Sequence, residues 1–322
     1  MSVKWGILST ADINGKLLAG SARSDEVDVI AVASREQSRA ESYAREHGIE
    51  RAYGSYDELL ADPDVEAIYN PLPNTMHAEW SIRALEAGKH VLCEKPFSSD
   101  PDEVAGAFDV ADRTGLHLSE AFMWRHNPQT RRLVELVAEG AIGELRLVRS
   151  AFSYALFDSG NIRLRTDVDG GALMDVGCYC VSGSRLLAGE PVSASGHAYR
   201  GPSGTDWVFA GVLRFAGDVF ATFDCGTSLA NRDELEAIGI EGSLFLDDPW
   251  HCRTPVIELR SDEGVERIEI VPADSYQLEL EDVSRAIREG GEPLLGRDDA
   301  MGQVRTIAAL RRSAAEGRVV EC

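Results

Sequence analysis

The first 122 residues alternate between short apolar runs and amphipathic stretches, and this alternation constrains the fold more than any other feature of the chain. The apolar runs have the length and composition of buried strands and span residues 3–8, 27–33, 65–69, 90–93 and 116–122. Helical periodicity fills the gaps at 35–47, 75–87 and 102–114, and a glycine follows each stretch, as at a left-handed helix C-cap. Because parallel neighbours need crossover helices, we expect an open, doubly wound parallel sheet.

The pattern changes after Phe122, where strand-like runs dominate. They span residues 145–154, 208–215, 219–224, 235–239, 243–246 and 256–259. Helical patterns cover 127–139, 177–187, 275–289 and 298–316. Runs of strands with few helices between them predict a mostly antiparallel sheet packed against helices. We therefore expect an α/β chain of two domains, residues 1–122 and residues 123–322.

The charge balance excludes several classes of partner. The 322 residues include 54 acidic and 32 basic side chains, a net charge of −22, which repels nucleic acid and anionic lipid. No apolar run is long enough to span a membrane, and the amino terminus lacks a signal-peptide pattern. We expect a cytoplasmic protein with reduced cysteines and neither a nucleic-acid nor a membrane partner.

The turn after the first apolar run stands where a dinucleotide-binding fold carries the sequence G-x-G-x-x-G. Ser9, Ala11 and Asn14 occupy the three glycine positions. The first two are small enough for the backbone to approach a pyrophosphate, but an ordinary strand–helix turn is the alternative. The cofactor-binding candidates in this turn are Ser9, Thr10, Ala11, Asp12 and Ile13.

The end of the second strand indicates which dinucleotide is bound. An NAD site usually has an acidic residue there, whereas this chain has Ser34 and Arg35, with Arg39 on the same face of the next helix. A hydroxyl and two guanidinium groups suit a 2′-phosphate, so we favour NADP over NAD. The alternative is that the two arginines form surface pairs with Glu36, Glu41 or Asp57.

Two further loops lie at the predicted carboxyl edge of the sheet, where such sheets bind ligands. The loop after the third strand carries Asn70, Pro71, Leu72, Asn74 and His77, which we expect near the nicotinamide ribose. The alternative is a proline-stiffened turn in which Asn74 or Thr75 caps a helix.

Glu94-Lys95-Pro96 follows the fourth strand. The Lys95 ammonium could orient a substrate hydroxyl and lower the pKa of a neighbouring acid. A surface ion pair beside a helix start is the alternative for this tripeptide.

The segment 170–180 carries Asp175 and Tyr179, which project from one face of a helix because they are four residues apart. A carboxylate can accept a hydrogen bond from a substrate hydroxyl, and a phenol can move the hydroxyl proton. The alternative for Asp175 is a helix N-cap. Cys178 and Cys180 supply only half of a zinc site, so we expect no metal.

Together these motifs resemble the glucose-fructose oxidoreductase/inositol dehydrogenase/MocA family. The resemblance rests on E-K-P, S-E-A-F-M-W-R-H-N-P and G-G-A-L-M-D-V-G-C-Y, and it continues through segments 224–226, 239–243 and 276–282. Tyr179 is similar to the branch of dimeric trans-dihydrodiol dehydrogenases and NADP-dependent D-xylose dehydrogenases, whereas other branches carry histidine there.

The resemblance implies a Rossmann domain followed by a substrate domain whose open sheet often forms the subunit contact, in a homodimer or homotetramer. It also implies that Tyr179 is the base in oxidation, that Lys95 stabilises its phenolate and that Asp175 holds the sugar hydroxyl. The substrate-binding candidates are Lys95, Phe122, Arg125, Asn161, Arg163, Asp175, Tyr179 and Tyr276, with Trp124 and His126 beside them. Glu94, Lys95, Trp124 and Arg125 are also cofactor-binding candidates.

The expected activity is NADP-dependent hydride transfer between a sugar or related diol and nicotinamide, with an aldose such as D-xylose as the favoured substrate. A trans-dihydrodiol or polyol dehydrogenase is the nearest alternative. A nucleotide-binding regulator without turnover is an alternative of another class, and so is an enzyme that couples two sugars through an NADP that it does not release.

Overall fold

A computed structural model describes residues 1–158 and 160–322 and divides them into two compact units. The first comprises Met1–His126 and Asp274–Met301, and the second comprises Asn127–Ala273 and Gly302–Cys322. A segment late in the sequence therefore folds with the amino-terminal residues. The division of roles between residues 1–122 and 123–322 stays a prediction.

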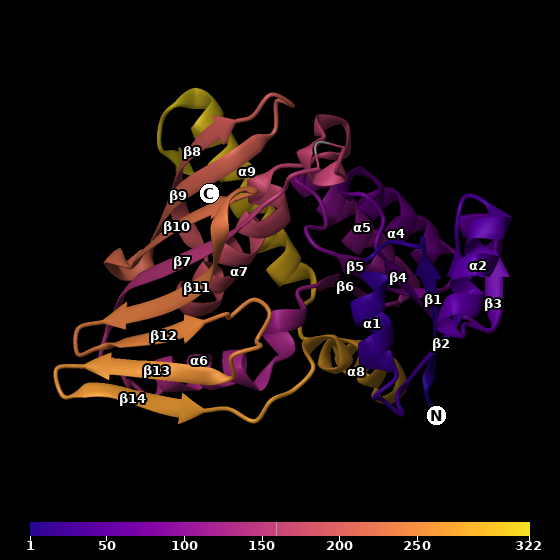
Figure 1. The fold of residues 1–322 in the computed structure, drawn as a ribbon, viewed down its shortest axis with the longest axis horizontal. Coiled ribbons are helices and arrows are strands. Elements are labelled where there is room, and N and C mark those ends of the chain that lie inside the picture. The colour runs from indigo at the N-terminus through magenta and orange to yellow at the C-terminus, as the bar shows by residue number, and fades with distance from the viewer. Residues whose placement is uncertain (159) are drawn as a thin grey trace. The chain divides into compact units, whose positions relative to one another are not determined.

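The first unit contains a parallel sheet, labelled in Figure 1. Within the described residues it has six strands in the order β3-β2-β1-β4-β5-β6, and every pair is parallel. The strands are β1 Val3–Leu8, β2 Val27–Ala33, β3 Arg51–Tyr53, β4 Ala67–Asn70, β5 His90–Glu94 and β6 Leu118–Ala121. The strand order reverses between β1 and β4, where sheets of this kind bind ligands. The predicted doubly wound sheet is confirmed.

Helices connect the strands of this unit: α1 Asn14–Ser21, α2 Gln37–His47, α3 Tyr56–Leu60, α4 His77–Glu86 and α5 Pro101–Thr114. Helix α8 (Ser275–Glu289), from the later segment, packs on α1, β1 and β2. Gly48 and Gly115 end α2 and α5 in the left-handed conformation, as predicted, with φ of 71° and 67°. Figure 1 shows α8 beside α1, which it contacts. Leu280 and Val283 of α8 pack in one core with Trp5, whose indole N–H donates to Ser284 Oγ at 3.2 Å.

The second unit contains a larger sheet. Its order over the described residues is β14-β13-β12-β11-β7-β10-β9-β8-β15, and only β7 and β10 pair in parallel. The strands are β7 Leu145–Ala155, β8 Pro191–Arg200, β9 Asp206–Phe215, β10 Phe220–Gly226, β11 Ser228–Gly239, β12 Ser243–Asp247, β13 Val256–Ser261, β14 Gly264–Glu269 and β15 Val320–Glu321. The predicted, mostly antiparallel sheet is confirmed.

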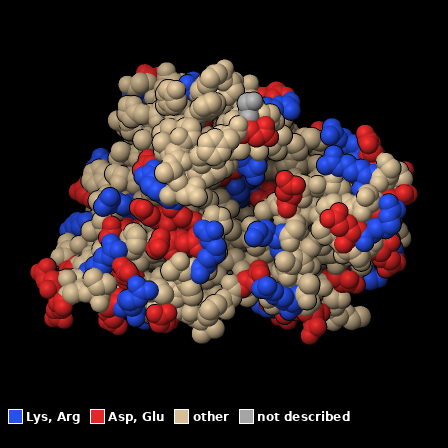
Figure 2. Space-filling view, viewed as in Figure 1, with Lys and Arg blue, Asp and Glu red and all other residues tan. Residues whose placement is uncertain are grey.

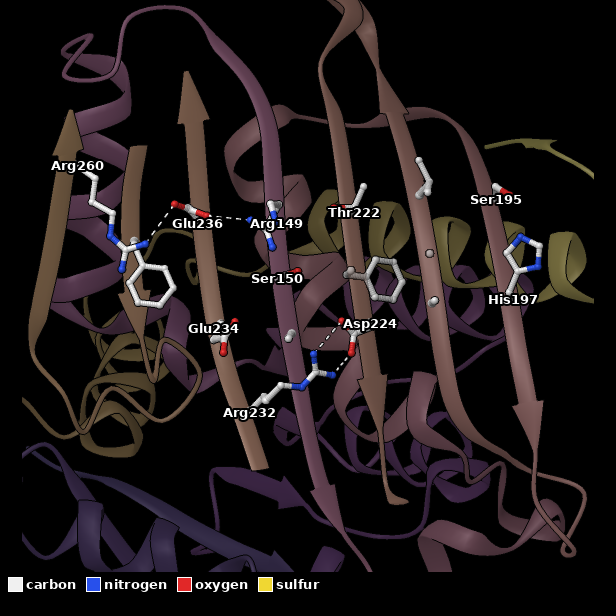
Figure 3. Close-up of a pocket in the computed structure, with 16 residues that line it drawn as sticks. Arg149, Ser150, Ser195, His197, Thr222, Asp224, Arg232, Glu234, Glu236 and Arg260 are labelled. Atoms are coloured by element: carbon white, nitrogen blue, oxygen red, sulfur yellow. Dashed lines mark hydrogen bonds and ion pairs between the residues drawn. The ribbon is translucent and has the colours of Figure 1, made fainter. Parts of the chain in front are cut away.

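Helices lie on one side of this sheet, behind the strands in Figure 3. Helix α6 (Pro128–Ala138) packs on β13, and α7 (Cys178–Ala188) packs on β7, β10 and β11. Helix α9 (Arg297–Glu316) begins in the first unit and continues into the second. Short helices complete the chain: Asn74–Met76, Met123–His126, Ile162–Leu164, Thr166–Val168, Ala216–Asp218 and the π-helix Leu173–Gly177.

The surface carries both signs of charge. On the face shown in Figure 2, Lys and Arg side chains lie among Asp and Glu side chains. Arg288, for example, pairs with Glu66 at 2.6 Å. No helix within the described ranges is long and apolar enough to cross a membrane.

Candidate active site

The turn between β1 and α1 has the backbone of a glycine loop, although the glycines are absent. Ser9, at the first glycine position, has a φ of +90°, in the region that favours glycine. Its N–H donates to Ala33 O at 3.0 Å, and its carbonyl accepts from Asn14 Nδ2 at 3.0 Å. Ala11, Asp12 and Ile13 lead directly into α1, whose first turn has no acidic side chain. The amino end of α1 thus suits an anion.

Two arginines stand beside this turn. Arg39 Nε donates to Thr10 Oγ1 at 2.7 Å, which joins α2 to the turn. Arg35 and Arg39 are exposed. Burial raises the pKa of Tyr56, and the charges of the two arginines oppose this rise. Among the described residues, neither arginine forms an ion pair, so the alternative surface pairs are not observed. Ser34, between the strand and Arg35, is buried.

The loop after β4 is held together by two buried side chains. Asn70 is fully buried, and its Nδ2 donates to His77 O and Ser81 Oγ, each at 3.1 Å. His77 places Nδ1 3.0 Å from Pro96 O and Nε2 2.6 Å from Leu72 O. Burial lowers the pKa of His77 to about 4, so its imidazole is neutral at neutral pH. A neutral imidazole carries one N–H, so His77 donates to only one of these two carbonyls, and its ring lies between the loop after β4 and the loop after β5.

A short helix runs over Asn74–Met76 in this loop. Its N-cap position is Pro73, so the alternative of Asn74 or Thr75 as the capping residue is not the one observed. Pro71 and Leu72 lie in the loop between β4 and this helix, at the carboxyl edge of the sheet.

Glu94 and Lys95 stand at the same edge. Glu94 ends β5, where it accepts a hydrogen bond from the Tyr69 hydroxyl at Oε1 and from the Lys95 N–H at Oε2, the latter at 3.2 Å. Burial and the Glu94 charge raise the pKa of Tyr69. No helix starts at this tripeptide, since α5 begins at Pro101, and the Lys95–Pro96 peptide is cis. The structure thus places Lys95 on a loop beside the loop that His77 holds.

The remaining candidates of the first unit are largely buried. Phe122 and Trp124 are fully buried, and Arg125 pairs with Asp299 at 3.1 Å. His126 Nδ1 lies 3.9 Å from Asp282 Oδ2. Burial, with the charges of Glu94 and Glu279, raises the pKa of Tyr276. Phe122, Trp124, Arg125 and Tyr276 all belong to the unit that holds Lys95.

Glu279 was not predicted from the sequence. It is fully buried on α8, and neither carboxyl oxygen has a hydrogen-bond partner among the described residues. Burial, followed by the charges of Glu94 and Asp282, raises its pKa well above the ordinary value of 4.5. Its spacing of three residues from Tyr276 was the available signal, since both then face one side of a helix.

In the second unit, Asp175 lies inside a helical turn and not at its start. The π-helix Leu173–Gly177 is preceded by Ala172, and the Leu173 N–H donates to Asp206 Oδ2 at 2.7 Å. The N-cap alternative for Asp175 is therefore wrong, because the N-cap positions are Ala172 for the π-helix and Gly177 for α7. Gly171, with a φ of +133°, packs so closely on Asp206 that a Cβ would collide with its carboxylate. Gly171 thus allows the close approach of Asp206 on β9.

The Asp175 carboxylate is held at both oxygens. Tyr154 donates its hydroxyl to Oδ2, and Arg163 Nε donates to Oδ1 at 3.1 Å. Asn161 accepts from the Arg163 N–H at 3.1 Å and so caps the short helix that carries Arg163. Tyr154 was missed because the sequence showed only a strand there. Its alternation with Ser150 and Phe152 was the signal that it faces α7.

Tyr179 is the second residue of α7 and is buried in an aromatic cluster. Its ring centroid lies 5.3 Å from that of Phe152, edge to face, and 5.9 Å from that of Trp250. The second unit thus brings Asn161 and Arg163 to Asp175 and places Tyr179 four residues after Asp175 in the same helical segment, whereas Lys95 belongs to the first unit.

One group has the composition of a metal site. The potential ligand atoms of Asp233, Asp248 and His251 lie within 4.8 Å of one another. Hydrogen bonds to Asp233 and then Asp248 raise the pKa of His251 to about 9, and Arg253 also pairs with Asp248. Two cationic side chains thus balance the two carboxylates, and this arrangement is an ion-pair cluster.

Comparison with known proteins identifies the family. Residues 4–122 match the model of an oxidoreductase family with an NAD-binding Rossmann fold, and residues 130–245 match that of the GFO/IDH/MocA C-terminal domain.

Named relatives cover most of the chain. It is 39% identical to the D-xylose 1-dehydrogenase (NADP(+)) 2 of Haloferax volcanii, over 98% of this chain and 99% of that one. It is 33% identical to the trans-1,2-dihydrobenzene-1,2-diol dehydrogenase of Homo sapiens, over 80% and 78%. The crystal structure of aldose-aldose oxidoreductase from Caulobacter crescentus, complexed with glycerol, matches all of both chains with a TM-score of 0.94 at 25% identity. The chain is therefore an oxidoreductase that belongs to the GFO/IDH/MocA family.

Proposed function

We propose that this protein is an NADP-dependent dehydrogenase that oxidises a sugar or related diol, with an aldose such as D-xylose as the favoured substrate. The observation that carries the proposal is the joint placement of Asp175 and Tyr179 on consecutive turns of one helical segment, with Asp175 held as a hydrogen-bond acceptor. The relative named as a D-xylose dehydrogenase, which matches nearly the whole chain, supports the substrate class.

The proposed chemistry divides the roles among three side chains. Asp175 accepts a hydrogen bond from a substrate hydroxyl and orients it. Tyr179 takes the proton of the reacting hydroxyl, and the Lys95 ammonium stabilises the phenolate that receives it. Bound NADP supplies the acceptor for the hydride that leaves the hydroxyl carbon. An aldose oxidised at its anomeric carbon would leave as a lactone.

NADP is proposed over NAD because of the groups that surround the β1–α1 turn. The positive φ of Ser9 and the amino end of α1, which no side chain caps, suit a pyrophosphate. Arg35, Arg39 and Thr10 offer cationic and hydroxyl donors beside the end of β2, where a 2′-phosphate would lie. Asn70 and His77 would support the nicotinamide end indirectly, through the loop backbone that they hold.

The first experiment measures reduction of NADP and, separately, of NAD with a panel of aldoses, polyols and trans-dihydrodiols. Turnover with a pentose and NADP is the expected result. Turnover only with a dihydrodiol or polyol would mean that this compound, and not an aldose, is the substrate. Binding of NADP without turnover across the panel would overturn the dehydrogenase and favour a regulator.

We also propose that the protein forms a homodimer or homotetramer through the outer face of the large sheet. Figure 3 shows this face, which carries a pocket on the side opposite the helices. Arg149 and Arg260 already pair with Glu236 there, at 3.6 and 3.5 Å, so a second copy would not bury them as isolated charges. Val212 is 43% exposed on this face.

Sedimentation tests the assembly. The wild-type protein is expected to sediment as an oligomer at micromolar concentration, and Val212→Asp is expected to shift it toward monomer. A wild-type monomer would contradict the proposal. The predicted cytoplasmic location is tested separately, by cell fractionation.

A further inference from the structure

We infer that Tyr154 is a positioning residue that aims the Asp175 carboxylate at the substrate hydroxyl. The inference rests on the proposed function, because it assigns Asp175 the role of hydroxyl acceptor. Neither the sequence motifs nor the family resemblance pointed to Tyr154.

Three separate segments meet at the Asp175 carboxylate. Tyr154 comes from β7, Arg163 from the short helix Ile162–Leu164, and Asp175 itself from the π-helix Leu173–Gly177. Tyr154 engages Oδ2 and Arg163 engages Oδ1. Two donors on different oxygens fix the rotation of a carboxylate about both of its side-chain torsions, which a single donor does not do.

The two donors differ in rigidity. Arg163 extends from a connecting segment, and its side chain is 47% exposed. Tyr154 stands on β7, which is paired on both sides by β10 and β11. On the same face of β7, Phe152 packs against Tyr179. One strand therefore supports both Asp175 and Tyr179. Of the two donors, Tyr154 is the one that holds Asp175 in a fixed position relative to Tyr179, the proposed base.

Tyr154 is suited to donate a hydrogen bond and not to transfer its proton. Burial, together with the Asp175 charge and hydrogen bond, raises the pKa of Tyr154 far above that of an ordinary phenol. Its hydroxyl stays protonated throughout the range in which such an enzyme works, and the carboxylate stays its acceptor. The phenol thus acts through Asp175 and does not compete with Tyr179 as a base.

The test is a double-mutant cycle of Tyr154→Phe and Asp175→Asn, with Tyr199→Phe as the matched control. Tyr199 is an exposed tyrosine on β8. Loss of a hydrogen bond to a charged group is expected to lower the kcat/KM of Tyr154→Phe about ten- to hundredfold. Adding Tyr154→Phe to Asp175→Asn should cost less than about twofold, because the two residues act as one unit. NADP affinity, measured by fluorescence, should stay at the wild-type value.

Equal fold losses from Tyr154→Phe in both backgrounds, or full activity of the single variant, would overturn the inference. If Tyr154→Phe does not fold, Tyr154→Gln, which keeps a donor, should exceed Tyr154→Leu in kcat/KM, and equal values would refute the role. A crystal structure of Tyr154→Phe gives a readout that is independent of turnover. A carboxylate that keeps its orientation within about 10–20° would contradict the inference even if the wild-type substrate proved to be another compound.

Discussion

Arg39 of α2 donates from Nε to Oγ1 of Thr10 at 2.7 Å, so the helix that follows the second strand is fastened to the turn that follows the first. This contact holds one guanidinium beside the proposed pyrophosphate turn, and Arg35 stands at the end of the strand before it. The contact therefore fixes the Arg39 guanidinium beside the proposed 2′-phosphate site.

The first prediction concerns Arg35→Ala and Arg39→Ala. Each variant is expected to lower kcat/KM for NADP about ten- to hundredfold, because a charge-assisted contact to the phosphate is lost, and to change kcat/KM for NAD little. Steady-state kinetics with both cofactors measures the ratio. Arg45→Ala, an exposed arginine of the same helix, is the control. Equal losses with both cofactors would exclude a role in phosphate recognition.

Ser9 carries a backbone cost that glycine would remove. Ser9→Gly is expected to raise the free energy of unfolding by about 1 kcal/mol, because glycine adopts positive φ without the Cβ clash. Ser9→Ala is the matched control, since it removes the hydroxyl but keeps the Cβ. Denaturant unfolding compares the two. Greater stability of the alanine variant would trace the cost to the buried hydroxyl instead.

Tyr179→Phe should abolish most of the turnover. The expected fall in kcat is about 10²- to 10⁴-fold, the usual contribution of a general base, while NADP affinity is retained. Stopped-flow or steady-state kinetics gives kcat, and cofactor titration gives the NADP affinity. An unchanged melting temperature would show that the aromatic cluster around Tyr179 is intact. Full activity of this variant would remove Tyr179 from the mechanism.

His77 predicts a loss of stability in acid. Its pKa is about 4 when buried, against an ordinary 6.5, so the unfolded chain binds a proton across this window that the folded chain does not. The free energy of unfolding should therefore fall by up to about 3 kcal/mol as the pH drops through the window. His77→Gln should flatten this part of the profile, whereas His47→Gln, at an exposed site on α2, should leave it unchanged.

Glu279 predicts the opposite dependence on pH. Its pKa is raised well above 4.5, so above that pH the unfolded chain releases a proton that the folded chain retains, and stability falls as the pH rises. Relative to wild type, Glu279→Gln should gain stability as the pH rises above about 4.5, by up to about 1.4 kcal/mol per unit. Glu289→Gln, exposed on the same helix, is the control. A difference that is constant with pH would mean that Glu279 is ionised in the folded protein.

The sequence predicted β1, β2, β4, β5 and β6 of the parallel sheet because they are largely buried and stand out as apolar runs. It missed the edge strand β3, which is short and half-buried. The strands it missed lack that signal. In β8 the run after Pro191 is mostly small and polar residues, and β14 is almost wholly exposed. Both obtain their strand structure from pairing with a neighbour, which a local pattern does not record.

The candidate site shows the same limit. Lys95, Asp175 and Tyr179 stood out through motifs, but the environment of Asp175 depends on Tyr154 and Asp206, which are far from it in sequence. The N-cap interpretation of Asp175 failed because Asp175 lies within the π-helix that runs directly into α7. His77 looked like a ligand-binding residue, and only its two carbonyl partners reveal its supporting role.

Residues 274–301 belong to the first unit, and this limits how the protein can be truncated or recombined with a relative. A fragment that stops at residue 122 or 126 would lack α8, and Trp5, Leu280 and Val283 could not form their common core. The nucleotide-binding half is thus not a linear module. A transplant of cofactor preference into or out of this chain would have to carry both sequence segments of the first unit, which are separated in the sequence by residues 127–273.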